Sequence, residues 1–175
     1  RVSGNIYATK IWMKFMSKLQ FSVNLSAPMN HLITLATDYE KFQQFLPDQL
    51  KSIRIIKKEI NETITEEVIV FSSIIKNQIK QSTLHKQISD DAIISEILSG
   101  PAKGTIMKTA FVKIDSGTRV DVEIDMKLSL KARLLSPIIK KKYKTVLLGI
   151  LYRMNGIALK MKWKNGRFFR NNKLG

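Results

Sequence analysis

Apolar and polar residues alternate near the start of the chain and again about two thirds of the way along it. Phe21, Val23 and Leu25 are separated by single polar residues, which is the period of a half-buried β-strand. Between residues 119 and 131 the alternation is longest, with apolar positions at Val120, Val122, Ile124, Met126, Leu128 and Leu130. The residues between them are charged or polar, so the pattern predicts an antiparallel strand with one buried and one solvent-facing side.

Five more segments rich in β-branched residues occupy the chain between these two strands. They cover residues 53–60, 64–71, 74–88, 92–98 and 105–114. Turn-forming residues separate them, as at Ser89-Asp90-Asp91 and Asp115-Ser116-Gly117. We therefore expect an antiparallel sheet of about seven strands.

Two short helices are predicted after the first strand. Ser26 is expected to cap the first of them, and Pro28 lies near its first turn, where a missing N–H costs nothing. Asp38 is expected to cap the second and Pro47 to end it. The aromatic residues of the second helix recur at helical spacing and are expected to close one end of the domain: Tyr39, Phe42 and Phe45.

A long amphipathic helix is predicted to start at Ser136-Pro137, with the serine as its cap. One apolar stripe runs along it at intervals of three and four residues: Ile139, Tyr143, Val146, Leu147, Ile150, Met154 and Ile157. We expect this helix, about 22 residues and roughly 33 Å long, to lie across the sheet and leave a cavity beneath it. Gly149 interrupts it at a cost of about 1 kcal/mol relative to alanine, which indicates a close approach to a ligand or strand, or a packing contact. The fold class is α+β.

The basic residues lie mainly at the two ends of the chain. The formal net charge is +16, all 14 acidic residues fall between positions 38 and 125, and residues 126–175 hold 14 basic residues and no acidic one. We divide the chain into an N-terminal extension at 1–17, a domain at 18–160 and a basic, aromatic tail at 161–175. Cysteine is absent, no run of about 20 apolar residues occurs and no signal peptide is evident. A cytoplasmic protein, peripheral to the membrane at most, is expected.

Three groups of residues resemble the START-like or helix-grip superfamily, which includes the polyketide cyclase/dehydrase-like proteins. They are Ala27-Pro28 with the later Asp38-Tyr39-Glu40-Lys41-Phe42 and Phe45-Leu46-Pro47, the segment Ser99-Gly100-Pro101-Ala102-Lys103, and the run from Val122 through Leu134-Leu135. Within the superfamily the sequence is most similar to the coenzyme Q-binding family and the related ribosome-association toxins. Those relatives carry a tryptophan in the strand after Gly-Pro, whereas this chain has Met107 and Thr109.

The resemblance implies a curved sheet wrapped around the C-terminal helix and a hydrophobic ligand, such as a quinone, isoprenoid or lipid, in an internal cavity. The residues expected to line that cavity are Phe71, Met107, Phe111, Val122, Ile124, Met126, Tyr143, Leu147, Ile150 and Met154. The same residues fit a plain hydrophobic core. No cofactor is required, and a monomer or weak dimer is expected.

Catalytic motifs are missing from the sequence. His31 and His85 lie far apart and are expected to be surface or hydrogen-bonded histidines, with no metal site between them. No nucleophile motif or phosphate-binding glycine loop occurs. We expect a binding protein rather than an enzyme. The alternative is a cyclase-like enzyme, for which Tyr143 is the candidate acid.

Basic and aromatic residues alternate at the C-terminal end and predict a contact surface. They are Lys140, Lys141, Lys142, Lys160, Lys162, Trp163, Lys164, Arg167, Phe168, Phe169 and Arg170. On an anionic membrane the cations would bind headgroups and the aromatic rings would anchor at the interface. On ribosomal or other RNA the same residues would contact phosphates and stack on bases. The sequence leaves both partners open.

Overall fold

The chain folds as one antiparallel sheet with helices on its concave side. The computed structural model describes residues 16–71, 75–129 and 133–170, without the side chains of 16, 71, 75–77 and 162–170. The strands are β1 (Met16–Leu25), β2 (Leu50–Lys58), β3 (Glu62–Phe71), β4 (Ile75–Ser89), β5 (Ala92–Ile97), β6 (Ile106–Ile114) and β7 (Gly117–Lys127). The helices are α2 (Met29–Thr37), the 3₁₀ helix η1 (Tyr39–Phe45) and α4 (Ser136–Arg170).

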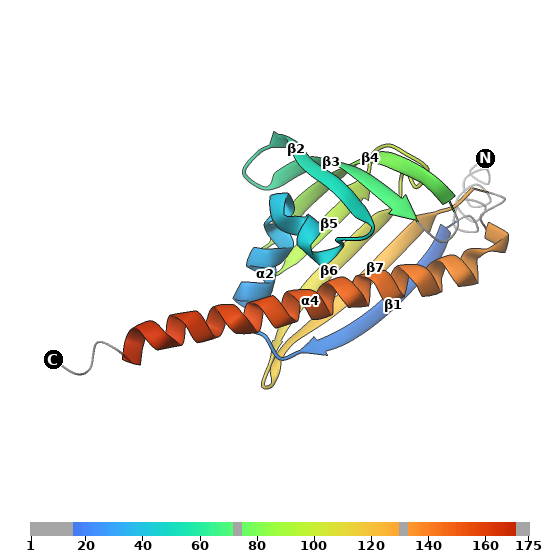
Figure 1. Ribbon diagram of the computed structural model, residues 1–175. Coiled ribbons are helices and arrows are strands. Elements are labelled where there is room, and N and C mark those ends of the chain that lie inside the picture. Colours follow the sequence, from blue (N-terminus) through green and yellow to red (C-terminus); the bar gives the residue numbers. More distant parts are fainter. Residues whose placement is uncertain (1–15, 72–74, 130–132, 171–175) are drawn as a thin grey trace, which may run out of the picture.

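The seven strands form a single sheet in the order β1-β7-β6-β5-β4-β3-β2, with every neighbouring pair antiparallel. From β2 to β7 each strand pairs with the next one in sequence, and β1 closes the order beside β7. The sheet curves around α4, which crosses its open side, while α2 and η1 cover one end (Figure 1). This is the predicted fold class and strand count.

The core lies between the inner face of the sheet and the helices. Leu32 of α2, Phe45 of η1, Phe111 of β6 and Met154 of α4 are among its most deeply buried side chains. The alternation predicted for the last strand is confirmed: Val120, Val122, Ile124 and Met126 are all buried. That strand ends at Lys127, before the predicted Lys131. The predicted positions Leu130 and Lys131 lie outside the described residues.

The last helix is longer than predicted. It spans 35 residues, from Ser136 to Arg170, so its backbone includes most of the stretch expected to form a separate tail. Ile150 and Met154 of the predicted apolar stripe are buried, and its other members pack against the core. In Figure 1 the C-terminal end of α4 extends beyond the edge of the sheet.

The predicted cap of α2 was wrong. Pro28 occupies its N-cap, while Ser26 stands two positions earlier and its hydroxyl accepts a 3.5 Å hydrogen bond from the Asn155 amide.

The other two predicted helix starts are met. Asp38 occupies the N-cap position of η1 as predicted, but its carboxylate pairs with Lys41 at 2.8 Å and caps no backbone N–H. The last helix, α4, begins at Ser136 as predicted, and the Ser136 hydroxyl is 2.7 Å from that of Ser17.

The expected close approach at Gly149 is also absent. A Cβ built on this residue meets no atom within 4 Å outside the helix itself. Gly149 is on the exposed side of α4. No neighbouring strand among the described residues therefore requires a glycine at this position.

Candidate ligand-binding cavity

A cavity of about 230 Å³ lies between the inner face of the sheet, α4 and the α2–η1 segment. Eight of the predicted residues line it: Met107, Phe111, Val122, Ile124, Tyr143, Leu147, Ile150 and Met154. Met126 is buried in the core and does not reach the cavity. The side chain of Phe71 lies outside the described residues.

Most of the wall is apolar. Tyr39, Phe42 and Leu46 contribute from η1 and the residue after it, and Leu50 and Ile53 contribute from β2. Isoleucine and methionine side chains of the other strands and of α4 complete the wall. The predicted aromatic closure at one end is therefore present, since Phe42 packs edge-on against buried Phe45 with centroids 5.3 Å apart. An apolar molecule in this cavity would exchange water for hydrocarbon on most of its surface.

One part of the wall is polar, and its centre is Glu67 of β3. This side chain is buried, and its two carboxylate oxygens accept three hydrogen bonds. Thr83 Oγ1 and Gln81 Nε2 each donate to Oε2 at 2.8 Å, and the Thr65 hydroxyl donates to Oε1. A buried carboxylate is tolerated only when donors replace its lost hydration, and these three supply that replacement.

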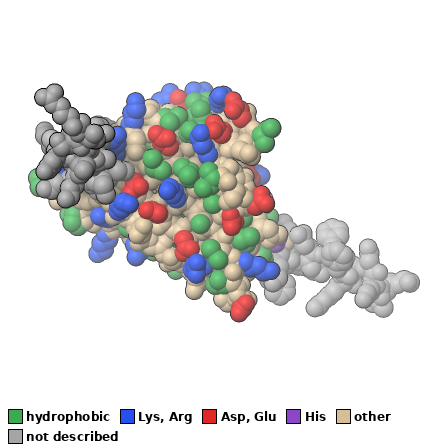
Figure 2. All heavy atoms as spheres, turned by 180° about the vertical axis from the view of Figure 1, so that it is seen from behind, with side chains coloured by type: hydrophobic (Ala, Val, Ile, Leu, Met, Phe, Trp, Pro, Cys, Tyr) green, Lys and Arg blue, Asp and Glu red, His purple; other side chains and the backbone are tan. Residues whose placement is uncertain are grey.

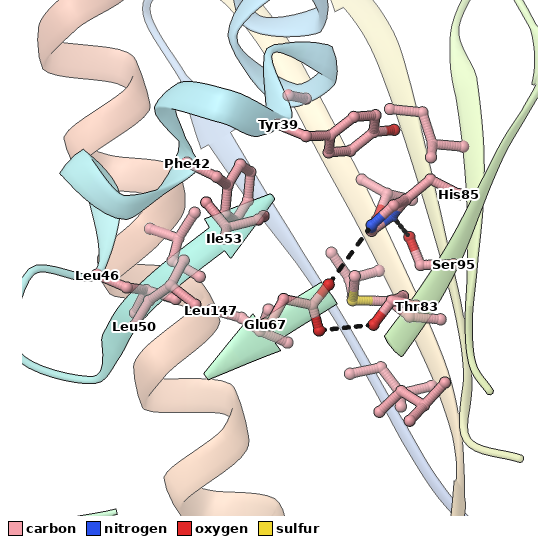
Figure 3. A pocket seen from close by; sticks show the side chains of 18 of the residues that line it. Tyr39, Phe42, Leu46, Leu50, Ile53, Glu67, Thr83, His85, Ser95 and Leu147 are labelled. Carbon is pink, nitrogen blue, oxygen red and sulfur yellow. Dashed lines mark hydrogen bonds and ion pairs between the residues drawn. The ribbon is translucent and has the colours of Figure 1, made fainter. Parts of the chain in front are cut away.

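His85 of β4 extends this polar group towards β5. Its Nδ1 lies 2.9 Å from the Ser95 hydroxyl and its Nε2 lies 3.0 Å from the Thr65 hydroxyl. Because Thr65 donates to Glu67, it accepts from Nε2–H, which leaves Nδ1 to accept from Ser95. Figure 3 shows His85, Ser95, Thr83 and Glu67 facing the cavity from the sheet, with Phe42, Leu46, Leu50 and Ile53 on the other side.

The histidine ring is neutral at neutral pH. Burial lowers the pKa of His85 to about 4. Its Nε2 is 3.9 Å from Glu67 Oε1, a distance that makes an ion pair only if the ring is protonated. We therefore describe the contact as a hydrogen-bonded chain through Thr65. The prediction that His85 is hydrogen bonded is confirmed, but the residue also lines the cavity.

Two tyrosines, Tyr39 and Tyr143, line the same cavity. Tyr39 stacks on His85, and burial raises the pKa of Tyr39 to about 12. Burial, with a smaller contribution from the charge of Glu67, raises the pKa of Tyr143. Both phenols are therefore protonated at neutral pH. In the part of the chain that the structure describes, neither hydroxyl has a hydrogen-bond partner in the protein.

The sequence analysis did not predict this polar wall, because no local sequence pattern indicates it. Glu67, His85 and Ser95 are far apart in sequence, and the register of β3, β4 and β5 brings them together: Glu67 pairs with Gln81, and His85 pairs with Ser95. The signal that the sequence offered is that residues two positions apart on a strand point to the same face. Thr65 and Glu67 therefore share one face of β3, and Ser95 shares one face of β5 with buried Ile93 and Ile97. Among the described residues, no group of three or more side chains is arranged to hold a metal ion.

The predicted contact residues lie along α4. Lys141, Lys142 and Lys160 are exposed and Lys140 is partly exposed. The side chains from Lys162 to Arg170 lie outside the described residues.

Figure 2 shows the opposite side of the molecule, where basic and acidic side chains are interspersed. Pairs such as Arg54–Glu66 and Lys18–Glu123 balance the charge of the outer sheet surface. No helix among the described residues is both long and apolar enough to cross a membrane.

Solved structures share this arrangement of sheet, cavity and helix. A protein from Thermus thermophilus matches with a TM-score of 0.71 and 16% identity over 83% of this chain and 99% of its own. The chain has the helix-grip fold. The Zhui aromatase/cyclase from Streptomyces superposes on this helix-grip chain with a TM-score of 0.69 and 11% identity, over 83% of this chain and 94% of its own.

A START superfamily protein from Mycobacterium smegmatis has the same helix-grip fold, with a TM-score of 0.68 and 14% identity over 82% of this chain and 98% of its own. The resemblance to START-like and polyketide cyclase-like proteins drawn from the sequence is thus confirmed at the level of the fold. No protein-family model and no curated protein sequence matches the chain. The narrower similarity to the coenzyme Q-binding family stays a prediction.

Proposed function

We propose that this protein binds an apolar small molecule in the cavity beneath α4 and carries or senses it without converting it. The observation that carries the proposal is a cavity with mainly apolar walls, built from both sides of the fold. Ligand sites are commonly of this kind, largely apolar with a few placed polar groups. The helix-grip structures that this chain resembles include a START superfamily protein and an aromatase/cyclase.

The size of the cavity favours a compact ligand. Its volume of about 230 Å³ lies below the roughly 300–1,000 Å³ of typical small-molecule sites. A quinone ring, a short isoprenoid or a single short acyl chain fits this volume better than a lipid with two long chains.

Binding without chemistry is supported by the state of the polar groups. The pKa of about 4 makes His85 a weak base. The Ser95 hydroxyl is hydrogen bonded to this weak base, so it gains little activation as a nucleophile. For a cyclase-like activity, the candidate acid is the protonated phenol of Tyr143, and its test is loss of turnover in Tyr143→Phe.

We propose further that α4 docks on anionic membranes from which the ligand is collected. Leu134 and Leu135, just before α4, and Ile138, in its first turn, are exposed, Leu134 to 87%. Lys140 and Lys141 follow two and three positions after Ile138. Exposed apolar side chains beside cations match the interface of an anionic bilayer, where each nearby cation contributes about 1 kcal/mol. RNA, by contrast, offers little to bind the leucines.

Ligand binding is tested first on protein purified from cells, by native mass spectrometry followed by organic extraction. The expected result is one apolar molecule per chain in the wild type and its loss in Leu147→Trp, which fills the cavity. Tyr152→Trp is the matched control, since Tyr152 is 56% exposed and lies outside the cavity lining. A wild type that is empty and also fails to bind the neutral dye Nile red would contradict the proposal.

Membrane docking is tested by co-sedimentation with phosphatidylcholine vesicles with and without phosphatidylglycerol. Binding to the anionic vesicles alone, reduced in a Leu134→Ser/Ile138→Ser variant, supports docking through α4. Binding to RNA that is lost in high salt and unchanged in this variant would favour the RNA-associated alternative.

A further inference from the structure

Among the described residues of the cavity lining, Glu67 is the one acidic side chain. It is 6% exposed and accepts hydrogen bonds from Thr65, Gln81 and Thr83. These three donors replace the hydration that a carboxylate loses on burial. The wall of the cavity is therefore arranged to hold a carboxylate among hydrogen-bond donors.

The described part of the lining offers Glu67 no cationic partner. Among the described residues of the lining, none is lysine or arginine. His85 is the nearest candidate, at 3.9 Å, but burial keeps its ring neutral. The other titratable groups of the lining, Tyr39 from η1 and Tyr143 from α4, are neutral phenols. A second anion brought into this space would meet a like charge at low effective dielectric, without a cation to offset it.

The hydrogen-bonding capacity that remains open suits a hydroxyl group. A carboxylate has about four acceptor positions, and three of those on Glu67 are used by the protein. The Tyr143 hydroxyl has no partner among the described residues, and the charge of Glu67 contributes to the raised pKa of Tyr143. A ligand hydroxyl could donate to Glu67 and accept from a neighbouring phenol, whereas a ligand carboxylate can only accept.

We propose that Glu67 makes the cavity selective for apolar molecules that carry an uncharged hydroxyl group, such as alcohols and phenols, and excludes carboxylates and phosphates. The inference rests on the proposed function, because it assumes that the cavity takes a ligand. It narrows that function: free fatty acids and phosphorylated isoprenoids are rejected, and the corresponding alcohols are bound.

The test compares two probes that share one chain, 1-decanol and decanoate, at pH 8 and below their micelle-forming concentrations. Each is titrated as a competitor of Nile red on the wild type, Glu67→Gln and Glu66→Gln. Glu67→Gln keeps the shape of the side chain and removes its charge. Glu66→Gln is the matched control because it makes the same charge change one residue away, where Glu66 pairs with Arg54 and Lys80 outside the cavity. Thermal unfolding of each variant verifies that it is folded.

The wild type is expected to bind decanol at least about tenfold more tightly than decanoate, a difference equivalent to a single unfavourable charge contact. In Glu67→Gln the ratio falls to within about threefold, mainly because decanoate gains affinity, and in Glu66→Gln it is unchanged. Equal wild-type affinities, tighter binding of decanoate, or the same ratio in Glu67→Gln would overturn the selectivity and leave the proposed function intact. Failure of both probes and of Nile red to bind the wild type would overturn both.

Discussion

Tyr39 and His85 stack face to face, with ring centroids 4.2 Å apart and ring planes inclined by 20° (Figure 3). The contact joins η1 to β4. It places an aromatic ring on a histidine whose two nitrogens are already bonded to Ser95 and Thr65. The ring is thus enclosed by these three residues, and a proton added to it would be costly.

This burial predicts a pH-dependent stability. The pKa of His85 is about 4 in the folded chain, against about 6.5 in an unfolded one. Because folding favours the neutral ring, its contribution is complete above pH 6.5 and is lost as the pH falls towards 4, to an extent on the order of 3 kcal/mol. Urea unfolding of the wild type and His85→Gln between pH 7.5 and 4.5 measures it.

In that series His85→Gln should lose less stability with acidification than the wild type, since glutamine does not titrate. His31→Gln is the control, because His31 bonds to the Ala158 carbonyl outside the cavity lining. Parallel curves for the wild type and His85→Gln would show that the burial of this ring has no effect on stability in this range.

Removing the Tyr143 hydroxyl should weaken ligand binding with little effect on folding. Tyr143 lines the cavity and its hydroxyl has no protein partner among the described residues, so Tyr143→Phe is expected to change the free energy of unfolding by less than about 1 kcal/mol. A hydroxyl-bearing probe such as decanol should lose roughly 3- to 10-fold in affinity, the value of one hydrogen bond. Nile red titration with decanol as competitor, beside urea unfolding, separates the two effects. A strong destabilisation with unchanged binding would assign the hydroxyl a structural role.

Two glycines should respond to alanine in opposite directions. Gly117 has φ of +144°, and a Cβ there would lie 2.1 Å from the Leu25 carbonyl oxygen. Gly117→Ala is therefore expected to destabilise the fold by about 2–3 kcal/mol or more. Gly149→Ala should stabilise it by about 0.5–1 kcal/mol, because helix propensity improves and nothing obstructs the methyl group. Urea midpoints compare the pair, and destabilisation by Gly149→Ala would show a contact that the structure does not contain.

Arg153 should hold η1 against α4. Its Nη1 donates a 2.8 Å hydrogen bond to the carbonyl of Phe45, the last residue of η1. Arg153→Met keeps the aliphatic contact and removes the donor, so a loss of about 1–2 kcal/mol is expected. Arg119→Met, which breaks an exposed ion pair with Asp121, should change stability by less than about 1 kcal/mol. Equal effects in chemical denaturation would mean that the Phe45 contact contributes no more than a surface pair.

The predictions made from periodicity were correct where apolar residues occupy one face of a strand or helix. The strand around Val122 and the stripe through Ile150 and Met154 could be read because burial repeats at the period of the element. The length of α4 could not be read this way. Its basic, aromatic end lacks the apolar stripe, and the structure shows that the helical backbone continues there to Arg170.

The predicted side-chain caps at Ser26 and Asp38 did not form because each side chain has another partner. Ser26 accepts a hydrogen bond from Asn155, which is distant in the sequence, so cap propensity carries no information about it. Asp38 pairs with Lys41, only three positions along η1.

The amino-acid sequence alone was sufficient to predict the order of the elements and the α+β class, because the apolar period of each element is local. It also predicted part of the apolar wall of the cavity, on β6, β7 and α4, but not the side chains that η1 and β2 contribute. The polar side was decided by the tertiary structure. Glu67, His85 and Ser95 meet only because β3, β4 and β5 pair in one register, and a shift of one residue would turn all three to the outer face. The pKa of His85 and the unbalanced charge of Glu67 likewise depend on what packs around them, which no single segment of the sequence contains.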